Sequence, residues 1–220
     1  MQIKICGIMS AADGRMAAEL GAHAVGINFY RQSPRYVDEA TAAAILRDLP
    51  PFTDPVGIFV NQPLQSVFEA AGRLGRMQTI QWHGENREIS DAFPYRIVAA
   101  FSVGEKRHLL DIARYLETCR SVNRLPAAVL MDARVMGQFG GTGQTAPWNL
   151  LVDFQPGVPV ILAGGLTPDN VAEAIRIVRP FGVDVATGVE SKPGSKDAAK
   201  VRRFIENALE AAAGCQPHNS

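Results

Sequence analysis

Two side chains combine chemical reactivity with a position at the end of an apolar segment. Cys6 ends the run Gln2–Cys6, and Asp132 follows the wholly apolar run Ala127–Met131. A thiol can act as a base or a nucleophile when a neighbour activates it, and a carboxyl group can act as an acid. The alternatives are a small buried hydrophobe for Cys6 and a helix or loop cap for Asp132. Position alone does not decide between the catalytic and the structural role for either residue.

Three glycine-bearing turns in the second half of the chain have the composition of anion-binding loops. They are Gly140-Gly141-Thr142-Gly143, Ala163-Gly164-Gly165-Leu166 and Thr187-Gly188-Val189. Glycine lets backbone N–H groups approach an anion closely, and a helix N-terminus adds a partial positive charge. Glycines also close ordinary turns, so each turn alone is weak evidence. The nucleotide-binding patterns are absent, since no Gly-Lys-Ser/Thr follows Gly137 or Gly140 and no full G-x-G-x-x-G opens a helix.

Eight short apolar segments alternate with amphipathic patterns, and they must position these residues. The predicted strands are Gln2–Cys6, Ala24–Phe29, Pro55–Val60, Met77–Trp82, Arg96–Phe101, Ala127–Asp132, Val158–Ala163 and Val183–Thr187. The predicted helices are Ala11–Leu20, Asp38–Asp48, Leu64–Leu74, Asn86–Ala92, Gly104–Cys119, Trp148–Val152, Pro168–Val178 and Lys196–Ala213. Strict alternation implies parallel strands joined by crossover helices. A doubly wound open sheet would need fewer strands, so eight units in 220 residues favour a (β/α)8 barrel of the TIM type.

The chain shows no linker, low-complexity segment or charge block that would divide it. We therefore expect a single α/β domain, a barrel over residues 1–213, followed by a flexible tail over residues 214–220. In such barrels the active site lies at the C-terminal ends of the strands. The residues that this sequence places there are Cys6-Gly7, Ser33-Pro34-Arg35, His83-Gly84, Asp132, Gly164-Gly165 and Gly188, with Asp184 along the eighth strand.

The loops after strands seven and eight frequently bind phosphate in these barrels. Phosphate is therefore the better interpretation of Gly164, Gly165 and Gly188 than ordinary turns. Arg35 is either a surface charge or, beside such a site, a partner for an anionic substrate.

Charge and cysteine content exclude several classes of protein. The formal net charge is zero, with 22 basic and 22 acidic residues, which argues against a general nucleic-acid binder. Cys6, Cys119 and Cys215 form neither a zinc-type pair nor a disulfide framework, which favours reduced thiols in the cytoplasm. No apolar stretch approaches the length of a membrane span. We expect a cytoplasmic protein with no nucleic-acid or membrane partner.

Seven motifs in the chain resemble the phosphoribosylanthranilate isomerase family. They are Lys4–Ile8, Ser33–Val37, Val56–Asn61, Gln81–Gly84, Gly140–Thr145, Leu162–Leu166 and Gly182–Glu190, in order over nearly the whole chain. The cysteine motif, the Ser-Pro-Arg loop and the last glycine motif are highly specific in combination. Three positions depart from the pattern: Trp82 stands where the family more often has leucine, and Ala186 and Thr187 stand where serines are usual.

The resemblance implies an isomerase of tryptophan biosynthesis, a branch of aromatic amino-acid biosynthesis. It would convert N-(5-phosphoribosyl)anthranilate to 1-(2-carboxyphenylamino)-1-deoxyribulose 5-phosphate by an Amadori rearrangement. Cys6 would be the general base and Asp132 the general acid, and Arg35 would hold the anthranilate group. His83 and Asp184 would also contact the substrate. The glycines implied in phosphate binding are Gly141, Gly143, Gly164, Gly165 and Gly188.

The resemblance also implies that no metal or redox cofactor is needed and that a monomer is favoured over a homodimer. Two other functions compete with it. Another phosphate-binding barrel, such as the sugar-phosphate isomerase of histidine synthesis, generally has an aspartate on the first strand where this chain has Cys6. A non-catalytic binder of a phosphorylated ligand needs no acid–base pair, so the presence of both Cys6 and Asp132 argues against it.

Overall fold

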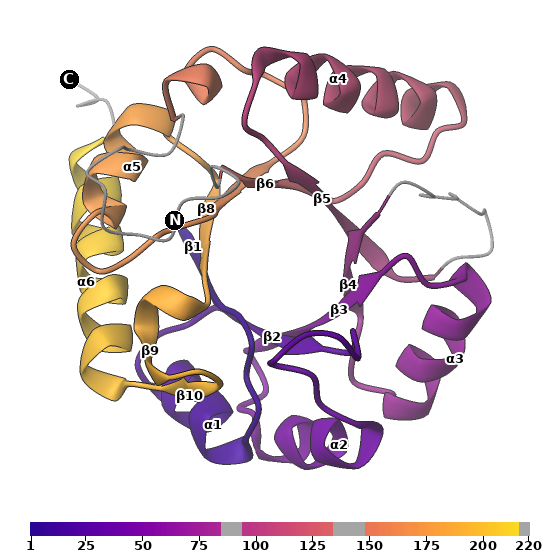
Figure 1. Cartoon of the computed structure of the whole chain (residues 1–220), viewed down its shortest axis with the longest axis vertical. Coiled ribbons are helices and arrows are strands. Elements are labelled where there is room, and N and C mark those ends of the chain that lie inside the picture. The colour runs from indigo at the N-terminus through magenta and orange to yellow at the C-terminus, as the bar shows by residue number, and fades with distance from the viewer. Residues whose placement is uncertain (85–93, 134–147, 216–220) are drawn as a thin grey trace.

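Eight parallel strands close into a barrel, with helices around its outside (Figure 1). The computed structural model describes residues 1–84, 94–133 and 148–215. The strands pair in chain order from β1 to β8, and β8 pairs back with β1. The predicted (β/α)8 barrel is confirmed. Strand β1 runs parallel to both of its neighbours, β2 and β8, because the connections between strands cross over the outside of the barrel.

The strands of the barrel are short and nearly match the predicted apolar segments. They are β1 Gln2–Ile5, β2 Ala24–Asn28, β3 Asp54–Val60, β4 Thr79–His83, β5 Arg96–Ser102, β6 Ala128–Asp132, β7 Val160–Ala163 and β8 Gly182–Val185. The α-helices are α1 Ala11–Glu19, α2 Glu39–Asp48, α3 Leu64–Leu74, α4 Lys106–Ser121, α5 Val171–Val178 and α6 Ala198–Gly214. Among the described residues, no helix has both the length and the apolar character to cross a membrane.

Several boundaries differ from the predictions. Helix α5 begins at Val171 rather than at Pro168, because Asn170 folds the preceding segment into a turn. Its side chain accepts a hydrogen bond from the Thr167 N–H at 2.8 Å and donates one to the Gly165 carbonyl at 3.0 Å. Such side-chain bonds offer the backbone an alternative to helix. The predicted helix over 148–152 is a 3-10 helix, η1 Trp148–Leu151, and the one over 86–92 lies entirely outside the described residues.

A small hairpin between β8 and α6 was not predicted. After the 3-10 helix η2 (Thr187–Val189), strand β9 (Glu190–Lys192) pairs antiparallel with β10 (Ser195–Lys196). Gly194, with φ at +82°, makes the turn between them. Lys196, predicted as the first residue of the last helix, therefore lies in β10, and the helix begins at Ala198 with Asp197 as its N-cap.

Strand alternation divides the apolar residues into two separate cores. The larger cluster fills the space between strands and helices and includes Ile5, Ile27 and Val183. The smaller cluster lies inside the barrel and consists of Val98, Ala100, Ala128, Leu130 and Ala163, with Ile161 against it. Because successive side chains point to opposite faces, Lys4, Gln81 and Asp184 also lie on the inner face. The barrel interior is thus lined by both apolar and polar side chains.

We predict that Phe204→Ala destabilises the fold by about 3–5 kcal/mol, because Phe204 on α6 is fully buried against the barrel and its truncation leaves a cavity. Urea unfolding followed by circular dichroism measures the change. Leu209→Ala is the matched control on the same helix, since Leu209 is 44% exposed, and we expect less than about 1 kcal/mol from it. Equal effects of the two substitutions would contradict this account of the outer core.

Candidate active site

The end of β1 holds Cys6 at the mouth of the barrel. Its backbone N–H donates to the Val185 carbonyl at 2.8 Å, which extends the pairing with β8 by one residue. Its side chain lies over Gly26 of β2: a Cβ added at Gly26 would be 2.7 Å from the Cys6 Sγ. Glycine at position 26 therefore makes room for the thiol. Cys6 is neither fully buried nor fully exposed.

A buried ion pair lies beside Cys6 on the same inner face. The Lys4 Nζ is 2.9 Å from the Asp184 Oδ1, and the two side chains are only 7% and 9% exposed. Their Cα atoms are direct partners in the β1–β8 pairing. Asp184, singled out from the sequence as a substrate contact, is thus bound to a lysine that the sequence analysis did not single out. The two-residue spacing of Lys4 and Cys6 was the available signal, since it puts both on one face of a strand.

Opposing effects set the pKa of the Cys6 thiol. Burial raises the pKa above its ordinary value, and the negative charge of Asp184 raises it further. The positive charge of Lys4, a hydrogen bond with Lys4 and the positive charge of Lys196 lower it. Burial lowers the pKa of Lys4, but Asp184 and Cys6 outweigh burial and leave it above its ordinary value. Lys4 therefore stays charged, and it is the strongest influence that favours the thiolate form of Cys6.

Asp132 ends β6 at the same rim of the barrel. It pairs in register with Ser102 of β5 and Ala163 of β7, and its carbonyl accepts a hydrogen bond from the Val103 N–H at 2.9 Å. One carboxylate oxygen is shielded from solvent. Strands β7 and β8 separate it from Cys6 around the barrel. The closed barrel therefore brings the predicted acid and base to one opening, 126 positions apart in sequence.

His83 ends β4 and lies beside a buried glutamine. The Gln81 Nε2 is 2.8 Å from the His83 Nε2, within hydrogen-bond distance. Trp82, between them, points to the opposite face of the strand. Its Cα partners are Phe59 of β3 and Ala99 of β5. The tryptophan is therefore buried on the outer face of the strand and does not fill the barrel interior.

The turns after β7 and β8 pack directly against each other. Gly164 and Gly165 have φ angles of +93° and +66°, which favour glycine. A Cβ at Gly188 would lie 2.0 Å from the Leu166 carbonyl oxygen, so glycine is required for this close approach of two loops. These three predicted phosphate-binding residues thus come together. The other two, Gly141 and Gly143, lie outside the described residues.

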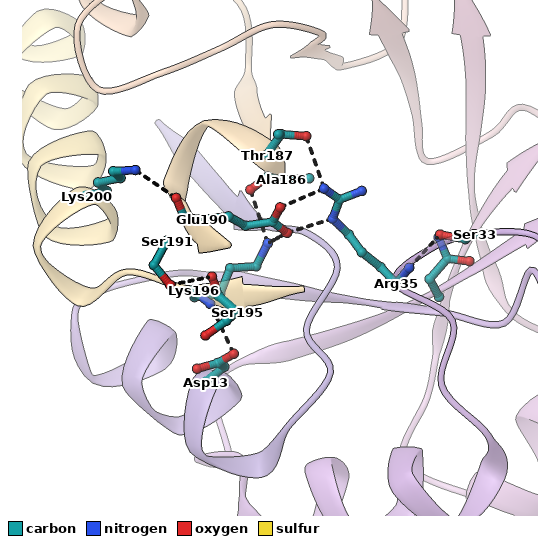
Figure 2. Close-up of polar contacts among 11 residues, drawn as sticks. Asp13, Ser33, Arg35, Ala186, Thr187, Glu190, Ser191, Ser195, Lys196 and Lys200 are labelled. Carbon is teal, nitrogen blue, oxygen red and sulfur yellow. Dashed lines mark hydrogen bonds and ion pairs between the residues drawn. The ribbon is translucent and has the colours of Figure 1, made fainter. Parts of the chain in front are cut away.

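A charged cluster joins Arg35 to the loop after β8, as Figure 2 shows. The Arg35 Nε donates to the Glu190 Oε1 at 2.6 Å and the Nη2 to the Glu190 Oε2 at 2.7 Å. The Nη2 also donates to the Thr187 Oγ1 at 3.3 Å. The stem of Arg35 crosses Gly7, where a Cβ would be 2.3 Å from its Cδ. Arg35 thus lies against Gly7, the residue after Cys6.

Two lysines complete this cluster. The Lys196 Nζ donates to the Glu190 Oε1 at 2.9 Å and to the Ala186 carbonyl at 3.1 Å, and the Lys200 Nζ donates to the Glu190 carbonyl at 2.7 Å. Neither Glu190 nor Lys196 was predicted from the sequence as a site residue. Glu190 belongs to the last glycine motif, which was the signal available for it. Lys196 had no such signal, because its position depends on the unpredicted hairpin.

Comparisons with known proteins agree over nearly the full length. A family model described as N-(5'phosphoribosyl)anthranilate (PRA) isomerase matches residues 3–207. The N-(5'-phosphoribosyl)anthranilate isomerase of Geobacter metallireducens is 46% identical over 209 residues, which cover 94% of this chain and 98% of the relative.

Solved structures give the same result. Phosphoribosyl anthranilate isomerase from Thermotoga maritima has a TM-score of 0.83 and 35% identity, covering 96% of this chain and 99% of that one. A phosphoribosyl anthranilate isomerase in complex with reduced 1-(o-carboxyphenylamino)-1-deoxyribulose 5-phosphate has a TM-score of 0.79 and 33% identity, with the same coverage.

We predict opposite effects of the two buried charges on Cys6. Lys4→Met removes the cation that lowers the thiol pKa, so the pKa rises and alkylation by iodoacetamide requires higher pH. Asp184→Asn removes an anion that raises the pKa, so alkylation begins at lower pH. The rate at Cys6, measured by peptide mass spectrometry across pH, reports both shifts.

The double variant Lys4→Met/Asp184→Asn serves as the control, because it leaves no unpaired buried charge. Alkylation of the double variant should still require a higher pH than that of the wild type, since the effect of Lys4 on the thiol pKa exceeds that of Asp184. An unchanged profile in Lys4→Met would show that Lys4 does not stabilise the thiolate.

Proposed function

The chain belongs to the N-(5'-phosphoribosyl)anthranilate isomerase family, and we propose that it uses Cys6 as general base and Asp132 as general acid. It is an isomerase of tryptophan biosynthesis. Its substrate is N-(5-phosphoribosyl)anthranilate, and its product is 1-(2-carboxyphenylamino)-1-deoxyribulose 5-phosphate. The observation that carries the assignment of roles is the position of Cys6 and Asp132, at the ends of β1 and β6 on the inner rim of one barrel.

The steps before the final tautomerisation move two protons, one from Asp132 and one to Cys6, and no step needs an oxidant. The Asp132 carboxyl group protonates the furanose ring oxygen as its bond to C1′ breaks, which gives an open-chain protonated imine. The Cys6 thiolate then takes the proton from C2′, and the released electron pair forms a C1′–C2′ double bond while the imine nitrogen becomes neutral. The resulting enolamine tautomerises to the ketone product. An acid is needed first and a base second, and the two residue types match this order.

The charge distribution supports Cys6 in this role. The thiolate and the phosphorylated substrate are both anionic, and cationic Lys4, Arg35 and Lys196 surround the position of Cys6. Positive charge favours the thiolate and the anionic ligand together. Since burial raises the thiol pKa, we expect kcat/KM to increase with pH through the titration of Cys6.

The two ends of the substrate have separate binding groups. We assign the phosphate to the backbone of Gly164, Gly165 and Gly188, together with Gly141 and Gly143. The paired loops after β7 and β8 support this assignment, because phosphate sites in these barrels lie there. We assign the anthranilate group to Arg35, whose planar guanidinium suits a carboxylate or an aromatic face.

His83 and Asp184 complete the proposed substrate contacts. His83 supports this assignment by its position at the inner end of β4. Asp184 has a second role through Lys4, because the ion pair holds the lysine charge beside Cys6. The reaction requires no metal and no redox cofactor.

The decisive experiment follows the fluorescence of freshly generated phosphoribosylanthranilate on addition of purified protein. We expect saturable loss of fluorescence above spontaneous hydrolysis, and a decrease in kcat of roughly 10²- to 10⁴-fold in Cys6→Ala and in Asp132→Asn. Cys215→Ser is the matched control, because Cys215 lies at the end of α6, and its activity should equal that of the wild type.

Each alternative gives a different result. Activity that survives Asp132→Asn would support the assigned substrate but show that Asp132 is not the general acid. A folded wild type that binds the phosphorylated substrate without converting it would favour a non-catalytic binder. Conversion of a different aminoaldose phosphate in place of this one would favour the related barrel isomerases.

We further propose a monomeric, cytoplasmic enzyme whose only partner is its phosphorylated substrate. Sedimentation velocity should give the mass of one 23.7 kDa chain. Phe52, 98% exposed in the loop before β3, provides a check, because a dimer at this face would bury it. A dimer mass that returns to the monomer in Phe52→Ser would contradict the prediction.

A further inference from the structure

We infer that Glu190, supported by Lys196, is a positioning residue that fixes Arg35 in the orientation in which it meets the anthranilate group. The inference rests on the proposed function, since it concerns how the proposed substrate-binding arginine is held. It adds two residues to the site that have no contact with the reacting atoms. Both lie in the β9–β10 hairpin, which follows the proposed phosphate loop (Figure 2).

The first observation is a bidentate ion pair. Both carboxylate oxygens of Glu190 accept hydrogen bonds from Arg35, at 2.6 and 2.7 Å, and the side chains are 4% and 18% exposed. Parallel N–H···O bonds of this kind fix the plane of the guanidinium as well as its position. An arginine on a rim loop has many rotamers available, so holding it in one orientation reduces the entropy lost when a substrate binds.

The second observation is that Glu190 is itself fixed and kept ionised. The side chain of Lys196 is fully buried, and its Nζ donates to Glu190 and to the Ala186 carbonyl. Burial alone would raise the pKa of Glu190, but the hydrogen bonds from Arg35 and Lys196 outweigh it and hold the pKa below its ordinary value. The carboxylate therefore stays charged between two cations. The three groups carry a net positive charge, which suits an anionic substrate.

The third observation concerns the donors that Arg35 has left. Its Nε and Nη2 are engaged by Glu190 and Thr187. Among the residues that the structure describes, Nη1 has no hydrogen-bond partner, and in Figure 2 it points away from Glu190. Arg35 would thus meet the anthranilate carboxylate through Nη1, or the aromatic ring through its face, rather than through its Nε edge.

The contact with Thr187 extends the same arrangement to the phosphate side. The Thr187 Oγ1 accepts from Arg35, which leaves the hydroxyl hydrogen available as a donor. Thr187 directly precedes Gly188 in η2, within the proposed phosphate loop. One network of hydrogen bonds therefore holds the groups for both ends of the substrate. The departure from serine at this position keeps the hydroxyl that the network uses.

The test compares Glu190→Gln with the wild type in three measurements. We expect KM to rise by roughly 10- to 100-fold, as for loss of a hydrogen bond between charged groups, with a much smaller change in kcat. The dissociation constant for reduced 1-(o-carboxyphenylamino)-1-deoxyribulose 5-phosphate, measured by titration calorimetry, should rise by a similar factor. Phenylglyoxal should modify Arg35 several-fold faster, because the carboxylate no longer shields it.

A double-mutant cycle separates positioning from general stability. In an Arg35→Met background, Glu190→Gln should cause no further rise in KM, because the residue through which Glu190 acts is missing. Glu206→Gln is the matched control, an exposed glutamate on α6, and should change neither KM nor the phenylglyoxal rate. Thermal unfolding of each variant checks that it is folded.

The outcomes distinguish the inference from the proposed function. Unchanged KM and phenylglyoxal rate in folded Glu190→Gln, or an equal effect in the Arg35→Met background, would overturn the inference. A wild type that neither converts the substrate nor binds the reduced product analogue would overturn the proposed function. The phenylglyoxal comparison would still decide whether Glu190 holds Arg35.

Discussion

The pairing of β8 with β1 closes the barrel and also sets the charge beside Cys6. In this register Lys4 faces Asp184, and the Cys6 N–H reaches the Val185 carbonyl. A shift by one residue would turn Lys4 and Cys6 out toward the helices, because side chains alternate between the two faces of a strand. The same shift would bury an ammonium group in the apolar outer core. The fold and the chemistry of the mouth therefore depend on a single register.

Near the pairing of β1 with β8, buried charged side chains lie in contact with side chains of opposite charge. Lys4 is paired with Asp184, and Glu190 lies between Arg35 and Lys196. The cations of both sets, Lys4, Arg35 and Lys196, lie near enough to Cys6 to interact with the charge of its thiolate. Glycine provides the space: Gly7 lies under the Arg35 stem, Gly26 faces the Cys6 sulfur, and Gly188 lets two loops meet. Ion pairs between buried charges and the space left by glycines together shape the site.

The sequence was sufficient where a signal is local. Helix α3 has the predicted bounds Leu64–Leu74, and the strand ends at Cys6 and Asp132 could be located because each ends an apolar segment. The sequence was insufficient where contacts between residues far apart in the chain determine the structure. The role of Lys4 depends on its ion pair with Asp184, 180 positions away in the sequence. Strands β9 and β10 are too short to show the alternation of apolar and polar residues that identifies a strand. The start of α5 moved because the Asn170 side chain bonds to the backbone of a preceding turn.

The distance along the chain between Lys4 and Asp184 has a consequence for biosynthesis. Cys6 leaves the ribosome long before Asp184, Glu190 and Lys196, which lie far beyond it in the sequence. Contacts this distant form late, since a long loop must close before they contribute. A growing chain therefore carries its thiol without the charges that surround it in the folded barrel. The reactive form of the cysteine and the binding site for its substrate arise together, when the last strand joins the first.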